Sequence, residues 1–332
     1  MSTTNRRIVL ISRPQGTPQA ENFRTEVVEI PELAEGEVLL RHSWLGLAPA
    51  ARLRMTEQAS YREPMALGDV VYGQAVGRVV ASKEPGLPVG TSVMSIGGGW
   101  QEYSIGNAEN LVKIDEAIAP PSVWLGALGT SGMTAYIGLL DLGKPRVGET
   151  VVVSAASGGV GSNVGQIARL KGCRVVGIAG GQEKVQHLTE VLGFDAAVDY
   201  RSPNFAEQLR VACPSGADIY FENVGGAVRD AVWPVMNQGG RIVVCGLIAE
   251  YNDNRQGGPG WFPILSKRLS IQGFIMSDHL HRQQAFLQDM RQWIREGRIQ
   301  VQEDVSEGLE SVVPAFIRLL TGKKFGKSVV KL

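Results

Sequence analysis

Apolar runs of strand length follow one another at short intervals in the first part of the chain. We expect strands over 6–12, 23–30 and 37–43, and further strands from 69–72 to 79–82, interrupted at Gly73 and Gly77. A turn that leads into a strand is expected over 88–95, and the β-pattern continues over 97–104 after a loop. In segment 23–30 apolar and charged side chains alternate, which is the pattern of a strand with one buried and one exposed face. Because short strands joined by tight turns are typical of closed β-structure, we expect about the first 115 residues to form a barrel-like domain.

The hydrophobic period lengthens from two to about 3.6 residues near Pro121. Helices are expected over 124–128 and 132–142, with a turn between them. Strands and helices then alternate, and the expected pairs are 150–154 with 160–171, 174–179 with 182–192, 196–199 with 204–211, and 217–222 with 226–236. Further strands are expected over 240–246 and 269–275. This alternation predicts a doubly wound parallel sheet with right-handed crossovers.

The last part of the chain begins with a long amphipathic helix over 279–296. Within the tail that follows, we expect a helix over 314–320 and a closing strand over 327–332. We expect this tail to return to the first domain, which would then be built from both ends of the sequence.

The stretch 151–165 carries the first chemical signal. Three consecutive valines predict a buried strand, small residues follow, and an apolar helical face begins at Val164. Such a turn points the first N–H groups of the helix at the loop, where they and the helix dipole favour a phosphate. The spacing Ala155-x-x-Gly158-x-x-Gly161 lacks the first glycine of the full dinucleotide fingerprint. An ordinary glycine-rich βα turn is the alternative, but the strand–turn–helix context favours a dinucleotide site.

Length and charge narrow the class of protein. A chain of 332 residues favours two domains over a single core. Lys plus Arg and Asp plus Glu both number 33, so the charge balance indicates neither a nucleic acid nor an acidic membrane surface as partner. The apolar runs are too short to cross a membrane, and the first twenty residues do not resemble a signal peptide. We therefore expect a cytoplasmic protein that acts on a small molecule.

Cysteine and histidine are too sparse and scattered for a metal site. Cys173, Cys213 and Cys245 are far apart in the sequence and odd in number, which fits a reducing compartment without a disulfide framework. No thiol pair has the spacing of a structural zinc site, and His42 is the only histidine in the first part of the chain. We therefore expect no metal.

The strand after the glycine-rich turn indicates which nicotinamide cofactor binds. In sites for NAD, an Asp or Glu at the end of this strand holds the 2′-hydroxyl of the adenine ribose. Here segment 173–181 ends in Ala-Gly-Gly, which leaves room for a 2′-phosphate. We therefore expect NADP(H), with Lys184 and Tyr200 as contacts, because an ammonium pairs with a phosphate. The alternative for Lys184 is a helix residue that only faces solvent. Glu183 would repel a 2′-phosphate, but in the first helical turn we expect it to face solvent.

Five motifs spread over nearly the whole chain are specific in combination. They are Ala155-Ala156-Ser157-Gly158-Gly159-Val160-Gly161-Ser162, Gly193-Phe194-Asp195, Glu222-Asn223-Val224-Gly225-Gly226, Gly240-Arg241-Ile242-Val243-Val244-Cys245-Gly246 and Gly326-Lys327-Ser328-Val329-Val330-Lys331. Together they resemble the zinc-independent branch of the medium-chain dehydrogenases/reductases, which includes leukotriene B4 12-hydroxydehydrogenases, prostaglandin reductases and NADPH-dependent curcumin reductases.

The resemblance implies a fold, a reaction and a set of cofactor contacts. It implies a GroES-like catalytic domain over 1–121 and 296–332, a Rossmann domain over 122–295, a homodimer, and reduction of the double bond of enones and enals by NADPH. The residues that match the family's cofactor contacts are Gly158, Gly159, Val160 and Gly161 at the pyrophosphate, Lys184 and Tyr200 at the 2′-phosphate, and Asn223, Cys245, Gly246, Leu247, Ile248, Tyr251, Phe274, Ile275, Met276 and Lys324 along the cofactor.

Tyr251 is the catalytic candidate. Hydride addition to the β-carbon of an enone moves negative charge onto the carbonyl oxygen, so a hydrogen-bond donor there lowers the barrier. Tyr251 follows a strand end at the edge of the sheet where ligands bind, and the resemblance assigns its position to the carbonyl or to the nicotinamide ribose. A loop tyrosine that packs on the cofactor without a chemical role is an equal alternative.

One segment departs from the family pattern. Where relatives often have Asp-Pro-Tyr-Met-Arg-Gly-Arg-Met, this chain has Ala-Pro-Ala-Ala-Arg-Leu-Arg-Met over 48–55. Ala48 and Ala50 in place of an aspartate and a tyrosine should enlarge or depolarise the substrate pocket, so the resemblance does not fix the substrate. Tyr61 is a second candidate for the pocket, with a core tyrosine as the alternative. Arg52 is a candidate contact for a phosphate or carboxylate, with a surface arginine as the alternative.

Two other functions stay open. A zinc-free quinone reductase would use the same cofactor geometry, so only a substrate panel separates the two enzymes. A non-catalytic NADPH-binding protein would bind the cofactor without oxidising it in the presence of enones, enals or quinones.

Overall fold

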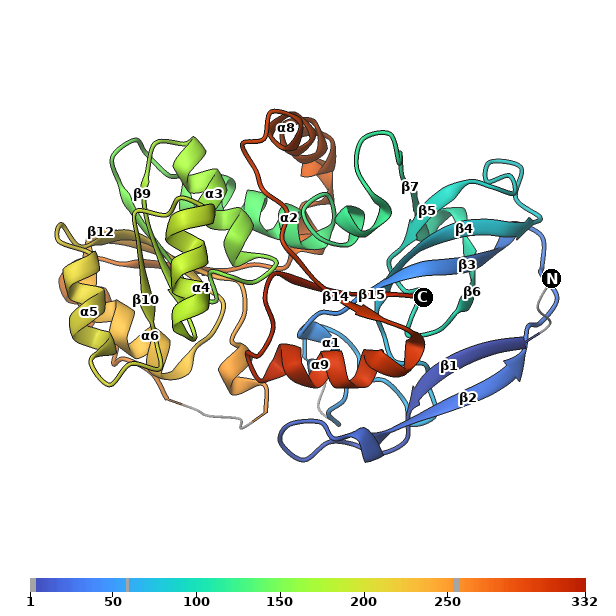
Figure 1. Ribbon diagram of the computed structural model, residues 1–332. Coiled ribbons are helices and arrows are strands. Elements are labelled where there is room, and N and C mark those ends of the chain that lie inside the picture. Colours follow the sequence, from blue (N-terminus) through green and yellow to red (C-terminus); the bar gives the residue numbers. More distant parts are fainter. Residues whose placement is uncertain (1–3, 58–59, 253–256) are drawn as a thin grey trace. The chain divides into compact units, whose positions relative to one another are not determined.

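The chain divides into two compact units in a computed structural model, which describes residues 4–57, 60–252 and 257–332. The first unit comprises Met1–Gly126 and Glu303–Leu332, and the second comprises Ala127–Gln302. We call them the β-rich unit and the parallel-sheet unit (Figure 1). Among the described residues, no helix is long and apolar enough to cross a membrane.

The β-rich unit contains a two-stranded antiparallel sheet and a larger sheet in which one strand pair is parallel and the others are antiparallel. β1 pairs with β2, and the larger sheet has the order β14-β15-β3-β4-β5-β7, with β6 also paired to β3. The strands are β1 (Thr4–Leu10), β2 (Phe23–Glu29), β3 (Glu37–Gly46), β4 (Gln74–Ser82), β5 (Ser92–Ser95), β6 (Tyr103–Asn107), β7 (Leu111–Lys113), β14 (Glu303–Glu307) and β15 (Lys327–Lys331). Because β15 runs antiparallel to β3, the C-terminal tail is part of this unit.

Segments that are far apart in sequence form the core of the β-rich unit. Its helices are α1 (Ala50–Leu53) and α9 (Val312–Leu320), with 3-10 turns at Ala20–Asn22, Ala108–Asn110, Pro121–Leu125 and Leu309–Ser311. The Trp100 ring is fully buried and lies 5.0 Å from the ring of Phe316 and 5.8 Å from that of Phe23, between centroids. One tryptophan thus joins the tail helix, β2 and the loop before β6.

The parallel-sheet unit has six parallel strands in the order β10-β9-β8-β11-β12-β13. They are β8 (Thr150–Val153), β9 (Arg174–Ala179), β10 (Ala196–Asp199), β11 (Ala217–Glu222), β12 (Met236–Val244) and β13 (Ser270–Gly273). The parallel sheet predicted from the βα alternation is confirmed. The chain moves outward from β8 to β10 and then returns to β11, so the strand order reverses between β8 and β11.

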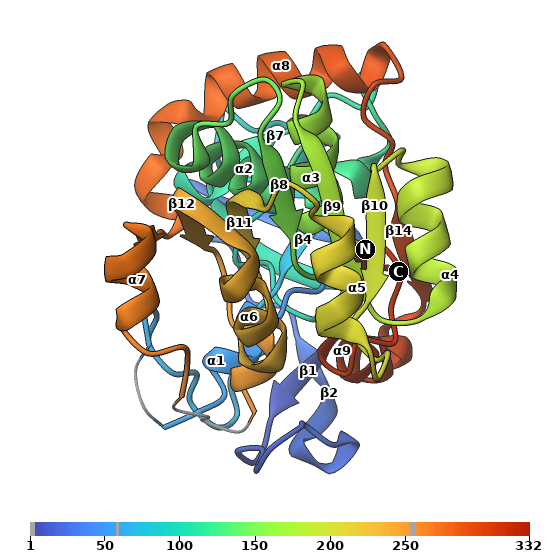
Figure 2. The same cartoon turned by 90° about the vertical axis from the view of Figure 1, so that its left-hand side faces the viewer.

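Helices cover both faces of this sheet (Figure 2). They are α2 (Thr130–Tyr136), α3 (Gly161–Leu170), α4 (Gln182–Gln186), α5 (Phe205–Ala212), α6 (Gly226–Val232), α7 (Phe262–Lys267) and α8 (Gln283–Arg295), with π turns at Ile137–Gly143 and His187–Val191. On one face, Phe205 and Leu209 of α5 and Val228 and Val232 of α6 pack on the strands. On the other face, α3 packs so closely that a Cβ on Gly165 would collide with the Phe194 ring.

Several elements differ from the expectations. Segment 69–72 forms only an isolated bridge from Val70 to Val9 instead of a strand. The helix expected over 226–236 ends at Val232 because Pro234 cannot donate a helical hydrogen bond, and a 3-10 turn at Trp233–Val235 leads directly into β12. The helix expected over 279–296 begins only at Gln283, after a kinked 3-10 segment in which His279 has non-helical backbone angles.

Candidate cofactor and active site

The expected cofactor residues of the parallel-sheet unit all follow the carboxyl ends of its strands. They are 158–161 after β8, Lys184 after β9, Tyr200 after β10, Asn223 after β11, 245–251 after β12 and 274–276 after β13. Ligands of doubly wound sheets bind at this edge, where the strand order reverses. The fold therefore brings residues from six separate segments to the one edge that can hold a dinucleotide.

The turn between β8 and α3 has the backbone shape that its small residues suggested. Ala155 adopts the left-handed conformation at φ 47°, which costs about 1–2 kcal/mol for a residue with a Cβ. The missing fingerprint glycine would stand at the next position, Ala156. The Gly158 N–H donates to the Ala155 carbonyl at 2.9 Å and closes the turn. A Cβ on Gly161 would collide with the Ala155 carbonyl oxygen and lie 2.8 Å from the Ala156 Cα. Gly161 is thus needed for α3 to start this close to the strand.

A buried polar network fixes Asn223 beside this turn. The Asn223 N–H donates to Ser154 Oγ at 2.8 Å, and Asn223 Nδ2 donates to the Ser154 carbonyl at 2.8 Å. Glu222 is 1% exposed, and its Oε1 accepts from Ser154 Oγ at 3.0 Å and from the Val224 and Gly225 N–H groups at 2.7 and 3.0 Å. Burial raises the pKa of Glu222, and these donors oppose the rise. The sequence predicted Asn223 as a site residue, but it did not predict that Ser154 and Glu222 would fix Asn223 and the backbone after it by hydrogen bonds.

The end of β9 is shaped by residues that follow β10. An ideal Cβ on Gly180 would lie 2.7 Å from the Tyr200 ring, so glycine is required for the ring to lie over this strand end. Lys184 lies half-buried in the first turn of α4, and Glu183 is exposed, as expected. The region combines a cation, a phenol and a neutral strand end, which suits a 2′-phosphate.

The loop after β12 is folded back on itself. The Tyr251 hydroxyl accepts a hydrogen bond from the Leu247 N–H at 3.2 Å. Glu250 Oε1 accepts from the Gly226 N–H at 3.1 Å and from Arg229 Nη1 at 2.8 Å, which ties the loop to the start of α6. Burial raises the pKa of Cys245 to about 12, so its thiol stays protonated and inert. The segment 247–251 is therefore fixed, with Tyr251 directly after the 3-10 turn Ile248–Glu250.

The residues after β13 pack against the sheet's other elements. The Phe274 ring lies so close to Gly138 that an ideal Cβ there would be 2.7 Å from it, and its centroid is 6.2 Å from that of His279. Ile275 and Met276 follow at the start of the 3-10 segment and are half-buried. A ring held on both sides is suited to forming one wall of a cofactor site.

The remaining candidates belong to the β-rich unit, and two of the alternatives considered for them are wrong. Arg52 is not a surface residue: it is 3% exposed, and its Nη2 donates to the Gly16 carbonyl at 2.9 Å. Tyr61 is not a core residue, because it is 50% exposed. Ala50 is half-buried at the start of α1, and Lys324 Nζ donates to the Gly326 carbonyl at 2.5 Å. The pocket roles of Ala50, Tyr61 and Arg52 stay predictions.

Two ionisable groups are buried in the β-rich unit without a place in the expected site. His42 Nδ1 lies 2.8 Å from the Gln101 carbonyl oxygen, so it carries the proton, and Nε2 accepts from Ser104 Oγ at 2.8 Å. Burial lowers the pKa of His42 to about 4. Lys327 Nζ donates to the Leu47 carbonyl at 2.7 Å, and burial lowers its pKa to about 8. Lys327 thereby fixes the chain just before the altered segment 48–55.

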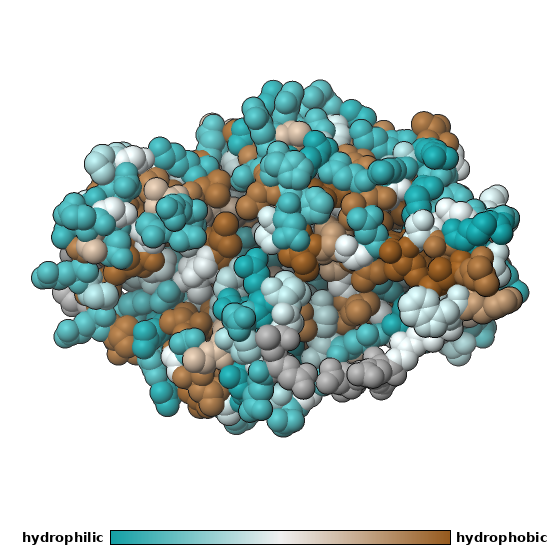
Figure 3. Space-filling view, turned by 180° about the vertical axis from the view of Figure 1, so that it is seen from behind, coloured by the Kyte–Doolittle hydropathy of each residue, from teal (hydrophilic) through white to brown (hydrophobic). Residues whose placement is uncertain are grey.

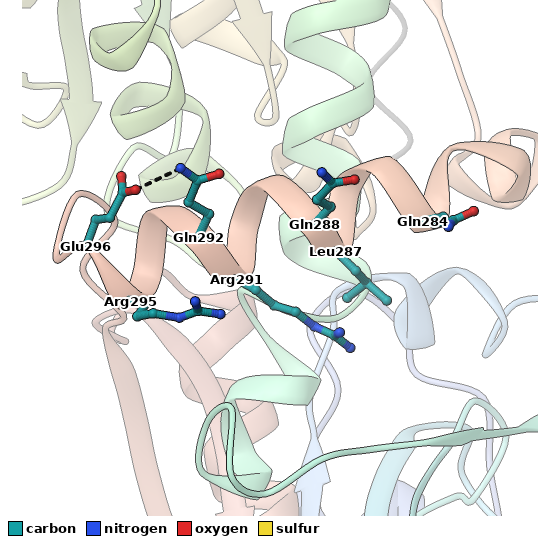
Figure 4. A pocket seen from close by; sticks show the side chains of 7 residues that line it. All are labelled: Gln284, Leu287, Gln288, Arg291, Gln292, Arg295 and Glu296. Atoms are coloured by element: carbon teal, nitrogen blue, oxygen red, sulfur yellow. Dashed lines mark hydrogen bonds between the residues drawn. The ribbon is translucent and has the colours of Figure 1, made fainter.

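Two surface hollows lie away from the expected site residues. One is lined by Leu287 and six polar side chains along a single face of α8, where Gln292 donates to Glu296 at 2.8 Å (Figure 4). The other surrounds His42 in the β-rich unit. No expected site residue in the described part of the chain lines either hollow. Within that same part, no three His, Cys, Asp or Glu side chains are grouped so that they could hold a metal ion.

Comparisons with known proteins match this architecture. Residues 6–114 match the N-terminal domain of oxidoreductases, and residues 159–295 match the zinc-binding dehydrogenase family. The chain is 49% identical to the NADPH-dependent curcumin reductase of Escherichia coli, over 99% of this chain and 97% of that protein. It is 43% identical to prostaglandin reductase 1 of Bos taurus, over 95% of each chain.

A solved structure extends the match to three dimensions. CurA from Vibrio vulnificus, in complex with NADPH, superposes with a TM-score of 0.93 and 49% identity, covering 98% of each chain. A likeness of this extent covers the GroES-like domain and the Rossmann domain together.

Proposed function

The chain belongs to the medium-chain dehydrogenase/reductase family, in the branch of the curcumin and prostaglandin reductases. From that premise we propose that it is an NADPH-dependent reductase of the carbon–carbon double bond of α,β-unsaturated ketones and aldehydes. The observation that carries the proposal is the convergence of the cofactor residues on the edge of the sheet where the strand order reverses. The match to a reductase of curcumin supports the substrate class.

Each part of the cofactor has a fitting partner in the chain. Residues 158–161 would hold the pyrophosphate with backbone N–H groups, and Lys184 and Tyr200 would bind the 2′-phosphate. Asn223, 245–251 and 274–276 would line the nicotinamide half. When bound, NADPH supplies the hydride that is added to the β-carbon of the substrate.

Tyr251 would assist at the substrate carbonyl or its enolate. Its hydroxyl oxygen accepts from the Leu247 N–H, and this bond uses a lone pair rather than the hydroxyl proton. A phenol polarised in this way donates a stronger hydrogen bond, because hydrogen bonds in a chain reinforce one another. A donor of this kind stabilises the negative charge that develops on the oxygen during reduction.

The reaction is tested with a panel of medium-chain enones, enals and quinones. We expect NADPH oxidation with enones and enals, and weaker turnover with NADH. With NADPH deuterated at the transferable position, the saturated product should carry deuterium at its β-carbon by NMR. Turnover of quinones alone would replace the proposal with a quinone reductase, and binding of NADPH with no turnover across the panel would leave a binding protein.

We also infer that the protein is a homodimer that joins through the parallel-sheet unit. β13 is an edge strand, and all four of its residues are exposed. Just before it in the chain, Trp261, Phe262 and Leu265 are 85%, 75% and 73% exposed. Figure 3 shows hydrophobic side chains gathered in a band on the face seen from behind. Exposed strand edges and apolar patches of this kind are typical of protein interfaces.

Light scattering coupled to size-exclusion chromatography tests the dimer. We expect twice the mass of one chain for the protein as it stands and a shift toward one chain for Leu265→Glu. The matched control is Val211→Glu on α5, where the valine is 70% exposed but not next to β13. A monomeric parent protein would contradict the inference.

A further inference from the structure

Arg201 lies at the end of β9 together with the residues expected at the 2′-phosphate. Its Cζ is 5.6 Å from the centroid of the Tyr200 ring, a cation–π arrangement. An ideal Cβ on Gly180 would lie 3.0 Å from Arg201 Nε, and one on Gly181 would lie 4.0 Å from Nη1. The guanidinium therefore extends across the strand end that carries no acid.

The acidic side chains near Arg201 leave its guanidinium able to bind an anionic ligand. Arg201 is exposed, and within the described ranges no carboxylate forms an ion pair with it. The nearest acid in sequence, Asp199, accepts the Arg201 backbone N–H at 2.9 Å instead. Glu183 is exposed on α4, and Lys184 adds a second cation in the same turn. A cation that is oriented by a neighbouring ring and unused by any carboxylate is suited to an anionic ligand.

Gly180 explains why the chain has this arrangement. In a site for NAD, an acidic side chain near this point would accept hydrogen bonds from the ribose hydroxyls. In this chain a side chain at Gly180 would meet both the Tyr200 ring and the Arg201 guanidinium. Glycine at position 180 therefore places no carboxylate near the adenine ribose and leaves room for the Arg201 guanidinium.

We propose that Arg201 is a specificity-determining residue that binds the 2′-phosphate of NADPH in a bidentate contact and, with Lys184, sets the preference for NADPH over NADH. The inference rests on the proposed function and adds a residue to it. Arg forms two parallel hydrogen bonds to a phosphate, whereas Lys acts as a single charge, so the two residues contribute differently.

Binding of two nucleotide fragments tests the proposal without turnover. Calorimetry compares adenosine 2′,5′-bisphosphate with adenosine 5′-monophosphate on the parent protein and on Arg201→Gln. We expect Arg201→Gln to weaken bisphosphate binding about tenfold, the loss typical of one charged hydrogen-bond partner, and to leave monophosphate binding unchanged. The KM for NADPH should rise similarly, while the KM for NADH should not.

Two variants make the test specific. Arg210→Gln on α5 removes another exposed arginine of the same unit and should leave both affinities unchanged. Arg201→Lys keeps the charge but loses the bidentate geometry, so its bisphosphate affinity should lie between those of the parent and Arg201→Gln. An unchanged ratio of the two affinities in both Arg201 variants overturns the proposal. A parent protein that does not favour the bisphosphate contradicts the cofactor assignment itself, which is a separate failure.

Discussion

Asn223 is fixed to Ser154 by two hydrogen bonds of 2.8 Å, although the residues are 69 positions apart. One bond runs from the Asn223 N–H to the Ser154 hydroxyl, and the other from the Asn223 amide to the Ser154 carbonyl. Since Ser154 follows β8 and Asn223 follows β11, the pair joins the two strands between which the strand order reverses. The amide of Asn223 is thereby oriented before any ligand arrives.

Ser154→Ala should weaken both the fold and the cofactor site. The Asn223 N–H would lose its acceptor and Glu222 one donor, and a buried unpaired group typically costs about 1–3 kcal/mol. We expect a drop of this size in the free energy of unfolding from urea titration and a higher KM for NADPH. Ser215→Ala, at an exposed serine of the same unit, is the control and should change neither. Equal stability of Ser154→Ala and the parent would contradict the role of the network.

Tyr251→Phe should lower turnover more than cofactor affinity. General acid assistance typically contributes about 10²–10⁴-fold, so kcat should fall by about 100-fold or more while the KM for NADPH changes little. Tyr200→Phe is the matched variant, and it should instead raise the KM for NADPH with little change in kcat. Steady-state kinetics with one enone measures both. If Tyr251→Phe keeps the parent's kcat, Tyr251 has no catalytic role.

Gly161→Ala should disrupt the turn between β8 and α3. The new methyl group would collide with the Ala155 carbonyl, so helix and strand would have to separate. We expect a loss of about 1–3 kcal/mol in the free energy of unfolding, as for an overpacked site, together with weaker NADPH binding. Gly260→Ala is the control, because nothing lies within 4 Å of an ideal Cβ there. NADPH titration by fluorescence and urea unfolding would detect both effects.

His42 should make the protein less stable as the pH falls from 6.5 to 4. Its pKa is lowered from 6.5 to about 4 in the folded state, so in this window the unfolded chain binds more protons than the folded one. The stability contributed by neutral His42 is complete above pH 6.5 and falls by about 1.4 kcal/mol per pH unit below it, to a total of about 3 kcal/mol.

Urea unfolding of the parent and His42→Gln at several pH values isolates this effect. The difference in unfolding free energy between the two should shrink as the pH falls from 6.5 to 4. Only the parent loses the contribution of neutral His42, because glutamine at position 42 does not titrate. His281→Gln, at an exposed histidine, should follow the parent. A difference that stays constant with pH would show that His42 does not titrate in this window.

The sequence by itself determined the order and type of most elements in the parallel-sheet unit. The spacing of Ala155, Gly158 and Gly161 predicted a strand, a tight turn and a helix, and the structure has β8, a closed turn and α3 there. Local patterns succeed here because the hydrophobic period directly reports how burial alternates along a strand or helix. They were less accurate at helix ends such as Val232, where Pro234 and the start of β12 set the limit.

Only the tertiary structure decided which side chains the distant segments cover. Arg52 is buried against the Gly16 backbone and Tyr61 is half exposed, and neither outcome follows from the residues beside them. The position of the Arg201 guanidinium over the Gly180 backbone likewise depends on β10 lying next to β9. The physical reason is that a local pattern reports burial along one element, whereas the lateral order of strands, which sets the neighbours of a side chain, is fixed by packing between residues far apart in the chain.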